Sequence, residues 1–457
     1  FTTDQSDSAR VIVRLAPTLN FIPSGQRIAV QLDNQQQVVN INGHYKGELG
    51  QWQKDHIIDI CCSFACPAGQ HTLRLTPLDN GIVMEKIMID WGGLQPSFLG
   101  PQETTNASLT TTWACAPQWL SNIPPLENQW LTQRVHASVG GEGLSLTLTN
   151  RFGESELSFD SVFVEQQPIL FDGQKAVSIP AGQDMASDLM PYTIHALDTL
   201  TITLYYNQVP VTLTGHSGSR TTSHLNSSLA LRAHHSLNSS LAQWVSILNI
   251  QTYNPKARIW AALGNSITDG RGTTTDKQNR WTDVVSTRLA DKQIGFINLG
   301  IGGNRVYGGG LGPTAAQRFE WDVLDQKGVE GVVLYIGGND IGESKNIDAT
   351  LDSLTTHSRR FITLARQQGL SVYACTVTPF EGHYYYTEEH EQLRQRFNDW
   401  LRTTALVDKV IDLDVVLADP NHPSAIPAAL QDNDGLHPSA LGHQRIGEAI
   451  SHVFDAL

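Results

Sequence analysis

Five residues in short polar or glycine-rich blocks have side chains or backbone geometry suited to acyl transfer. They are Ser266 in LGNSITDG, Gly303 in NLGIGGN, Asn339 in IGGND, and Asp434 with His437 in DNDGLHPSALG. A serine hydroxyl is a poor nucleophile unless a base takes its proton, and histidine has a suitable pKa for that task. The spacing of Asp434 and His437 lets one turn present both groups to the same side.

The chemistry of these five residues predicts a separate catalytic role for each. Asp434 would hold the Nδ1–H of His437, which leaves Nε2 free to take the proton of Ser266. The tetrahedral oxyanion needs preorganised donors, and the backbone N–H groups of Ser266 and Gly303 with the Asn339 amide would supply them. A glycine at position 303 also permits close backbone approach.

Each residue alone has an ordinary structural explanation. Ser266 suits any turn, Asp434 could form an Asx turn before Gly435, His437 could be a loop histidine, and Asn339 could cap a turn. Their occurrence together, each at the end of an expected strand, favours the catalytic interpretation.

The elements that must position these residues are expected to alternate between strand and helix. Apolar runs typical of buried parallel strands occupy 258–263, 294–300, 331–337, 370–377 and 409–414. Helical patterns lie over 282–292, 350–369, 388–405 and 440–457. This order predicts an open, doubly wound α/β sheet with its active site at the carboxyl ends of the strands.

The first half of the chain has the pattern of β structure. Short alternating runs over residues 1–105 predict a small antiparallel sandwich, and a second β-rich segment follows a linker at 100–106. The polar segment 225–242, in which LNSSLA occurs twice, is interpreted as a connection. We therefore predict three domains, over 1–105, 106–235 and 236–457.

Composition excludes some classes of function. The 457 residues carry a formal net charge of −14 and no compensating basic cluster, which disfavours nucleic-acid binding. No apolar run of about 18 residues is present, so no membrane span is expected.

Metal binding is also disfavoured. His234, His235, His383 and His390 have no carboxylate or cysteine at ligand spacing, and CCSFAC lacks a second ligand pair for a zinc ribbon. We interpret its three cysteines as strand and turn residues, one of which could form a disulfide.

The blocks GNSITDG, NRWTD, NLGIGGNRV, GGNDIG, TPFEG and DGLHPSALG resemble those of a secreted bacterial branch of the SGNH (GDSL-type) hydrolases. The resemblance covers about 255–457. It implies a flavodoxin-like domain, ester hydrolysis by Ser266, His437 and Asp434, no metal or organic cofactor, and a secreted or periplasmic location. Where that family usually has aspartate, this chain has Asn265, which keeps the oxygen acceptor without the charge.

Residues 10–103 resemble part of the C-terminal β module of family 115 alpha-glucuronidases, which remove glucuronic acid branches from xylan. This resemblance implies that the chain acts on an acetylated polysaccharide or oligosaccharide, with O-deacetylation of glucuronoxylan as the reaction. It also implies a chain truncated at its start and a covalently linked glucuronidase upstream. Two alternatives stay open: a broad short-chain esterase or lipase, and a carbohydrate-binding protein with an inactive hydrolase domain.

Several other loop residues are candidates for substrate contact. Aromatic side chains in loops stack on sugar faces, although they pack against the scaffold at least as often. The candidates for an acyl or sugar pocket are Arg280, Trp281, Asn304, Arg305, Phe380, Glu381 and Tyr384.

Overall fold

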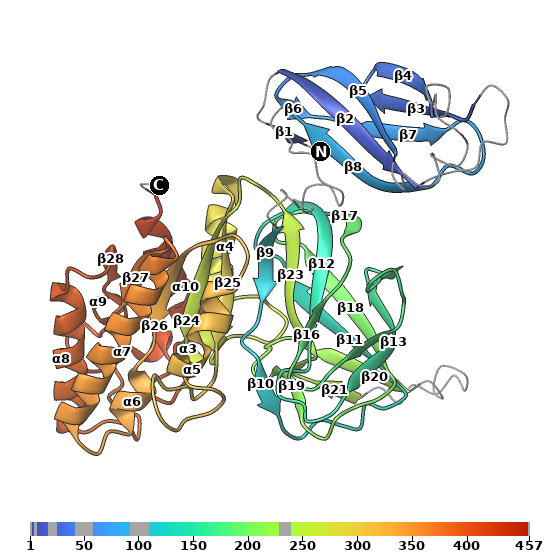
Figure 1. Ribbon diagram of the computed structural model, residues 1–457. Helices are drawn as coiled ribbons and strands as arrows, with labels where there is room; N and C mark the ends of the chain where they lie inside the picture. Colours follow the sequence, from blue (N-terminus) through green and yellow to red (C-terminus); the bar gives the residue numbers. More distant parts are fainter. Residues whose placement is uncertain are drawn as a thin grey trace. The chain divides into compact units, whose positions relative to one another are not determined.

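The computed structural model describes residues 2–3, 7–16, 25–41, 58–91, 109–227 and 239–455. The chain divides into two units, Phe1–Thr105 and Asn106–Leu457, and each is described by itself (Figure 1). The expected linker at 100–106 and residues 228–238, which include His234, His235 and part of the LNSSLA near-repeat, lie outside the described residues.

The N-terminal unit consists of small antiparallel sheets, as the alternating pattern predicts. One sheet has the order β5-β2-β8, a second has the order β4-β3-β7, and β1 pairs with β6. The strands are β1 (Thr2–Thr3), β2 (Asp7–Leu15), β3 (Arg27–Leu32), β4 (Gln35–Asn40), β5 (Ile58–Cys66), β6 (Gly69–Gln70), β7 (Leu73–Pro77) and β8 (Met84–Asp90). Buried side chains of β2, β3 and β5 form one apolar core.

The CCSFAC stretch lies within strand β5. Cys62 and Cys66 are buried and Cys61 is exposed, which is the alternation of a strand with one covered face. All five cysteines of the chain are free, so the disulfide that the sequence allowed is not formed.

The second unit begins with a β-rich module, which we define as residues 109–253. Its three sheets have the orders β10-β19-β22, β14-β13-β18-β11-β20-β21 with β15 on β13, and β16-β12-β23-β9 with β17 on β12. The strands are β9 (Leu109–Ala114), β10 (Gln118–Leu120), β11 (Gln129–His136), β12 (Gly141–Thr149), β13 (Leu157–Val164), β14 (Gln167–Pro168), β15 (Val177–Ile179), β16 (Asp184–Ala186), β17 (Met190–Ile194), β18 (Thr199–Tyr206), β19 (Leu213–His216), β20 (Ser223–Ser227), β21 (Ser239–Leu241), β22 (Trp244–Val245) and β23 (Ile247–Tyr253).

The predicted boundary at 235/236 is wrong. Strand β23 pairs with both β12 and β9, and β22 pairs with β19, so residues 239–253 complete the sheets of the β-rich module. The partners of β23 lie in Gly141–Thr149 and Leu109–Ala114, far earlier in the chain, and an apolar run does not reveal which strand it will pair with.

The rest of the unit, residues 258–455, is built on a five-stranded parallel sheet with the order β25-β24-β26-β27-β28. Its strands overlap the predicted apolar runs, and the first four along the chain are buried over most of their length. They are β24 (Arg258–Gly264), β25 (Ile294–Gly300), β26 (Val329–Tyr335), β27 (Ser371–Cys375) and β28 (Lys409–Ile411).

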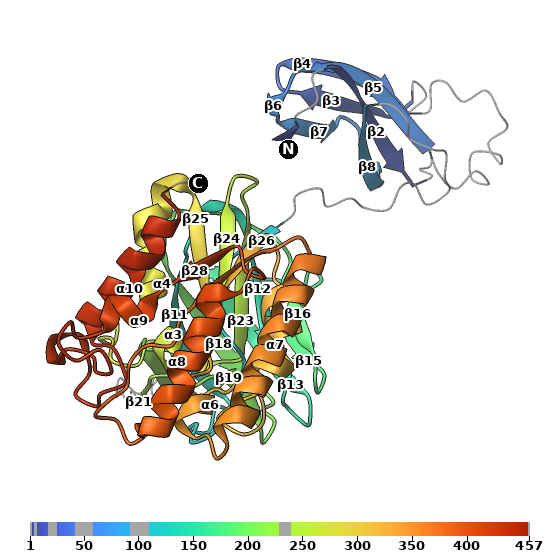
Figure 2. The same cartoon turned by 90° about the vertical axis from the view of Figure 1, so that its left-hand side faces the viewer.

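Helices cover both faces of this sheet (Figure 2). One core contains buried side chains of α5, α7 and α8, and the other contains those of α4, α9 and α10. The helices are α3 (Ser266–Asp269), α4 (Trp281–Leu289), η1 (Ala290–Lys292), α5 (Ala315–Phe319), η2 (Glu320–Leu324), α6 (Gly338–Gly342), α7 (Ile347–Gln367), α8 (Glu388–Thr403), α9 (Leu413–Leu417), η3 (Ala428–Leu430) and α10 (Ala440–Val453).

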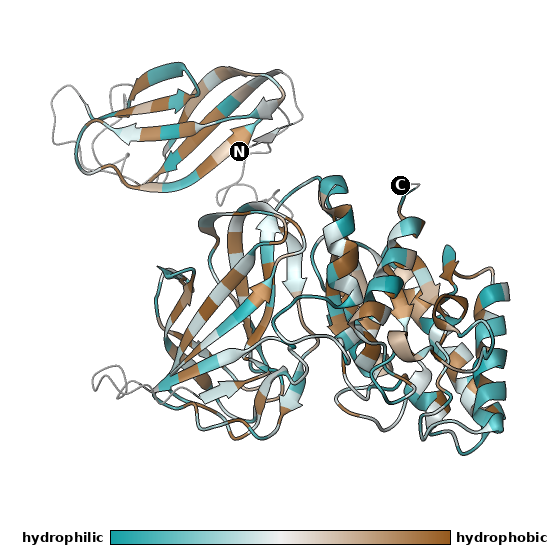
Figure 3. Cartoon of the chain, turned by 180° about the vertical axis from the view of Figure 1, so that it is seen from behind, coloured by the Kyte–Doolittle hydropathy of each residue, from teal (hydrophilic) through white to brown (hydrophobic). Residues whose placement is uncertain are grey.

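The three longest helices begin where their sequences provide an N-cap. The side chains of Asn346, Thr387 and Ser439 each accept a hydrogen bond from a backbone N–H of the first turn of α7, α8 and α10. Hydrophilic residues line the outward side of α8 (teal in Figure 3). None of the helices in the described part of the chain has the length and apolar character needed to cross a membrane.

Arg318 of α5 connects the ends of neighbouring strands from a fully buried position. Its guanidinium donates to the carbonyls of Gly264 and Leu299 at 2.9 and 2.7 Å and to Asn304 Oδ1 at 3.1 Å. Asp322 neutralises the charge, with Oδ2 2.7 Å from Arg318 Nη1, and both side chains are at most 1% exposed. The loops that leave β24 and β25 are thereby held together at one edge of the sheet.

We expect Arg318→Leu to lower the free energy of unfolding by about 3–5 kcal/mol, because it leaves Asp322 as an unpaired buried charge. Chemical denaturation monitored by tryptophan fluorescence would measure the change. The double variant Arg318→Leu/Asp322→Leu should recover part of the loss, since it removes the uncompensated charge. A double variant as unstable as the single one would contradict this explanation.

Candidate active site

Ser266 is the first residue of the short helix α3, directly after strand β24. Asn265 precedes it as the N-cap, and its Oδ1 accepts the N–H of Ile267 at 3.2 Å. The oxygen acceptor that Asn265 shares with aspartate is therefore used in the turn. This arrangement presents a half-buried hydroxyl at the carboxyl edge of the sheet.

His437 and Asp434 come from the loop before α10 and reach Ser266. Ser266 Oγ lies 2.8 Å from His437 Nε2, and His437 Nδ1 lies 2.6 Å from Asp434 Oδ2. The other oxygen of Asp434 accepts the backbone N–H groups of His437 and Leu436 at 2.8 and 3.0 Å. The carboxylate therefore fixes both the ring and the backbone of the loop.

The electrostatics keep the imidazole neutral and the carboxylate charged near neutral pH. Burial lowers the pKa of His437 below its ordinary value, although Asp434 opposes the shift. Burial alone would raise the pKa of Asp434, but hydrogen bonds from the backbone and ring of His437 and from Leu436 outweigh it and lower the pKa. A neutral imidazole can accept a proton from the serine hydroxyl.

Gly303 follows β25 in a loop beside the nucleophile turn. Its backbone is left-handed, with φ of +68°, and a Cβ added there would lie 3.0 Å from Leu311 Cδ1. Both facts favour glycine at this position. Among the hydrogen bonds of the described residues, none engages the N–H of Gly303 or of Ser266.

Asn339 lies in α6, directly beyond β26, and its amide is held at both ends. Its Nδ2 donates to the carbonyl of Asn304 at 2.8 Å, and its Oδ1 accepts the hydroxyl of Tyr385 at 3.3 Å. The neighbouring Asp340 accepts the N–H of Val306 at 3.0 Å and holds the facing loop. The amide therefore has a fixed orientation and one Nδ2–H to spare.

A small cavity adjoins Ser266 and Asn339. It offers about 10 Å³ to the centre of a water-sized group, which is room for about one water molecule. Apolar side chains of Ile267, Ile336 and Val377 line it together with other residues, which are Asn265, Ser266, Tyr335, Gly338, Asn339, Thr378 and Leu436.

Comparison with protein families agrees with this architecture. Residues 262–445 match the GDSL-like lipase/acylhydrolase family, and residues 1–103 match the C-terminal domain of glycosyl hydrolase family 115. The chain carries a GDSL-like hydrolase domain. Membership of this domain in an acylhydrolase family supports a carboxylic ester hydrolase activity. No curated protein matches the chain.

Solved structures similar to the hydrolase domain are related at low identity. They include a GDSL-family lipolytic protein from Veillonella parvula (20% identity, 44% of this chain, 100% of that chain, TM-score 0.35). A GDSL-like lipase from Bacteroides thetaiotaomicron is 19% identical over 44% of this chain and 90% of its own, with a TM-score of 0.33. An acetyl xylan esterase is 20% identical over 43% of this chain and 98% of its own, also with a TM-score of 0.33.

Four of the predicted substrate contacts are structural residues of the hydrolase domain. Trp281, Asn304 and Phe380 are fully buried. Arg280 is 5% exposed, and its guanidinium donates hydrogen bonds to the carbonyls of Ser219 and Asp269. These positions exclude direct contact with a substrate, so for these four we correct the prediction.

The remaining three candidates lie nearer to solvent. Tyr384 is 80% exposed, Arg305 forms an ion pair with Glu343, and Glu381 Oε1 lies 2.7 Å from His422 Nε2. Their positions leave contact with a substrate as a prediction.

Some residues of the site were not predicted. Tyr385, which holds the Asn339 amide, stands between two other tyrosines, and nothing in FEGHYYY distinguishes the inward one. No group of three or more potential metal ligands gathers among the residues that the structure describes.

We predict that the pKa of His437, measured by NMR titration of its imidazole, lies below about 6.5, because burial disfavours the charged ring. Asp434→Asn should lower this pKa further, since the carboxylate is the partner that raises it. His437→Gln identifies the resonance. A pKa that rises in Asp434→Asn would contradict the assigned electrostatics.

Proposed function

We propose that the hydrolase domain is a serine esterase that acts through Ser266, His437 and Asp434. The observation that carries this proposal is the continuous contact from Ser266 Oγ through His437 to Asp434. Ser266 Oγ attacks the ester carbonyl while His437 Nε2 takes its proton, and His437 then protonates the leaving alcohol. Water, deprotonated by the same imidazole, hydrolyses the acyl-enzyme and restores the serine.

The oxyanion of each tetrahedral intermediate would accept hydrogen bonds from Ser266 N–H, Gly303 N–H and Asn339 Nδ2. These donors lie beyond the carboxyl ends of β25, β24 and β26, which are adjacent strands at one side of the parallel sheet. Loss of one such donor typically raises a barrier by about 3 kcal/mol.

We propose acetyl as the acyl group. The cavity beside Ser266 has room for about one water-sized group, which suits a methyl better than a long chain. Its apolar lining, including Ile267, Ile336 and Val377, suits the same group.

We propose acetylated glucuronoxylan, or oligosaccharides derived from it, as the substrate. The match of residues 1–103 to the family 115 C-terminal domain supports this, because glucuronidases of that family act on xylan branches. Arg305, Glu381 and Tyr384 are the proposed sugar contacts. A covalently linked glucuronidase upstream remains part of the proposal, as does a secreted or periplasmic location, where such a substrate is accessible.

The proposal predicts acetate release from native acetylated glucuronoxylan, and Ser266→Ala should reduce it by roughly 10³-fold or more, since the nucleophile is removed. Acetate would be measured enzymatically, with para-nitrophenyl acetate as a small control ester. Circular dichroism of Ser266→Ala would establish that its fold is intact.

The same experiment separates the alternatives. Turnover of the small ester without release from xylan would favour a broad short-chain esterase. Binding of xylan with no ester turnover by the wild type would favour a carbohydrate-binding protein with an inactive hydrolase domain. Undiminished turnover in Ser266→Ala would overturn the mechanism.

Enlarging the cavity should relax the acyl preference. We expect Val377→Ala to raise the ratio of butyrate to acetate turnover by roughly tenfold, since one or two methyl-sized groups are worth about 1–3 kcal/mol in such a pocket. Para-nitrophenyl esters give the two values of kcat/KM. Val372→Ala, a buried valine outside the cavity lining, is the matched control and should leave the ratio unchanged.

A further inference from the structure

The nucleophile turn is bound from the β-rich module as well as from its own sheet. Asp269, the last residue of α3, is 3% exposed and lies three positions after Ser266. Its Oδ1 contacts His216 Nε2 of β19 at 2.8 Å, and its Oδ2 accepts the N–H of Gly302 at 3.1 Å. One carboxylate therefore links the β-rich module to the serine turn and to the residue before Gly303.

Both ring nitrogens of His216 are engaged in hydrogen bonds, which fixes the orientation of its contact with Asp269. Its side chain is 4% exposed, and Nδ1 lies 2.9 Å from the carbonyl of Ala116. A carbonyl can only accept, so Nδ1 carries a hydrogen, and the Nε2–Oδ1 contact with Asp269 needs another. A hydrogen therefore lies between Nε2 and Oδ1, and Gly302 N–H binds Oδ2, so both oxygens of the carboxylate are held in place.

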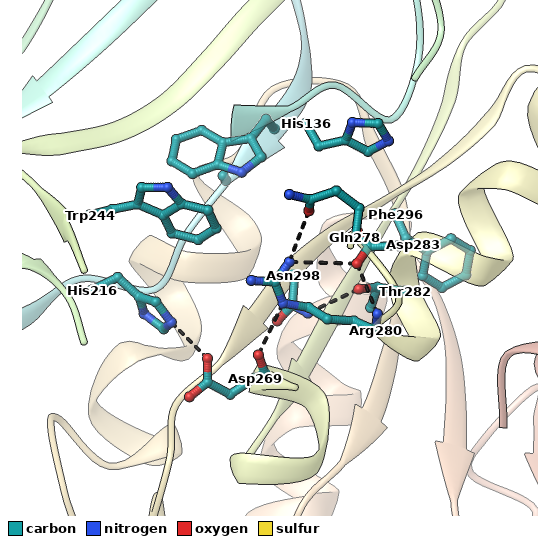
Figure 4. A pocket seen from close by; sticks show the side chains of 12 residues that line it. His136, His216, Trp244, Asp269, Gln278, Arg280, Thr282, Asp283, Phe296 and Asn298 are labelled. Carbon is teal, nitrogen blue, oxygen red and sulfur yellow. Dashed lines mark hydrogen bonds and ion pairs between the residues drawn. The ribbon is translucent and has the colours of Figure 1, made fainter. Parts of the chain in front are cut away.

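Figure 4 shows the contacts of Asp269 with His216 and with Arg280, and a glycine of the β-rich module supplies another. A Cβ added to Gly218 would lie 2.1 Å from Asp269 Oδ2, so this loop of the β-rich module is pressed against the carboxylate. Arg280 donates from Nε to the Asp269 carbonyl at 3.1 Å, binds the Ser219 carbonyl and lies over the Trp244 ring at 5.5 Å.

We propose that His216 is a positioning residue for the serine nucleophile, and that the β-rich module is thus an integral part of the active centre. His216 fixes Asp269, which orients both the turn that carries Ser266 and the loop that presents the Gly303 N–H. This inference rests on the proposed function, because the role of Ser266 is part of that proposal.

The experiment compares His216→Ala with Gln326→Ala. Gln326 Oε1 accepts from Thr111 and Asn249 of the β-rich module, and it precedes the amino end of β26, away from Ser266. With para-nitrophenyl acetate we expect His216→Ala to lower kcat by roughly tenfold to a hundredfold at little change in KM, because small displacements of reacting groups are costly. Gln326→Ala should keep kcat within about twofold even if its Tm falls equally.

Variants at Asp269 supply a second readout. Asp269→Ala should reduce kcat as His216→Ala does, and the double variant should be no worse than Asp269→Ala, because both remove one coupled contact. Asp269→Asn should recover most of the loss, since its amide can donate to a neutral His216 and accept from Gly302. Additive losses, or no recovery in Asp269→Asn, would count against the proposal.

If His216→Ala yields no folded protein, Gly218→Ala decides, because its Cβ displaces Asp269 while His216 stays in place. A fall in kcat at constant KM supports the proposal, and an unchanged kcat overturns it. Failure of the proposed function has a different signature, namely no ester turnover in the wild type or full turnover in Ser266→Ala. Normal kcat in folded His216→Ala, with turnover that depends on Ser266, overturns only the positioning role.

Discussion

The buried guanidinium of Arg318 fixes the geometry of the sheet edge beyond which Ser266 and Gly303 lie. It is fully buried and hydrogen-bonded to the carbonyls of Gly264 and Leu299 and to the side chain of Asn304, with Asp322 as its counter-charge. Burying a charge is costly unless its hydrogen bonds are made, so these partners cannot drift apart without a large free-energy penalty. The loops that carry Ser266 and Gly303 are therefore held rigidly where they leave the sheet.

The segment after β26, which carries Asn339, is linked to the Arg318 network through Asn304. Asn339 donates to the carbonyl of Asn304, whose side chain Arg318 already holds, and it accepts from Tyr385. An amide engaged at both ends cannot exchange its oxygen and nitrogen by rotation. The orientation of the proposed oxyanion donor is therefore a property of the buried network, to which the exposed Tyr384, the neighbour of Tyr385 in sequence, does not belong.

Local patterns predicted much of this fold, because parallel strands are apolar along their whole length and amphipathic helices begin at capping residues such as Thr387 and Ser439. Ser266 and His437 could be paired from sequence because carboxyl ends of parallel strands share one edge of a sheet. Burial of single loop residues could not be predicted, so Trp281 looked accessible although it lies in the core. Contacts such as His216 with Asp269 depend on how two modules pack, which no local pattern encodes.

The spacing of the site along the chain has a consequence for its folding. Ser266 and His437 are 171 positions apart, and His216 and Asp269 are 53 apart. Contacts between distant residues close late, since the loops between them must first lose their entropy. During synthesis Ser266 leaves the ribosome well before His437, so their contact cannot form until the loop that precedes α10 has been made.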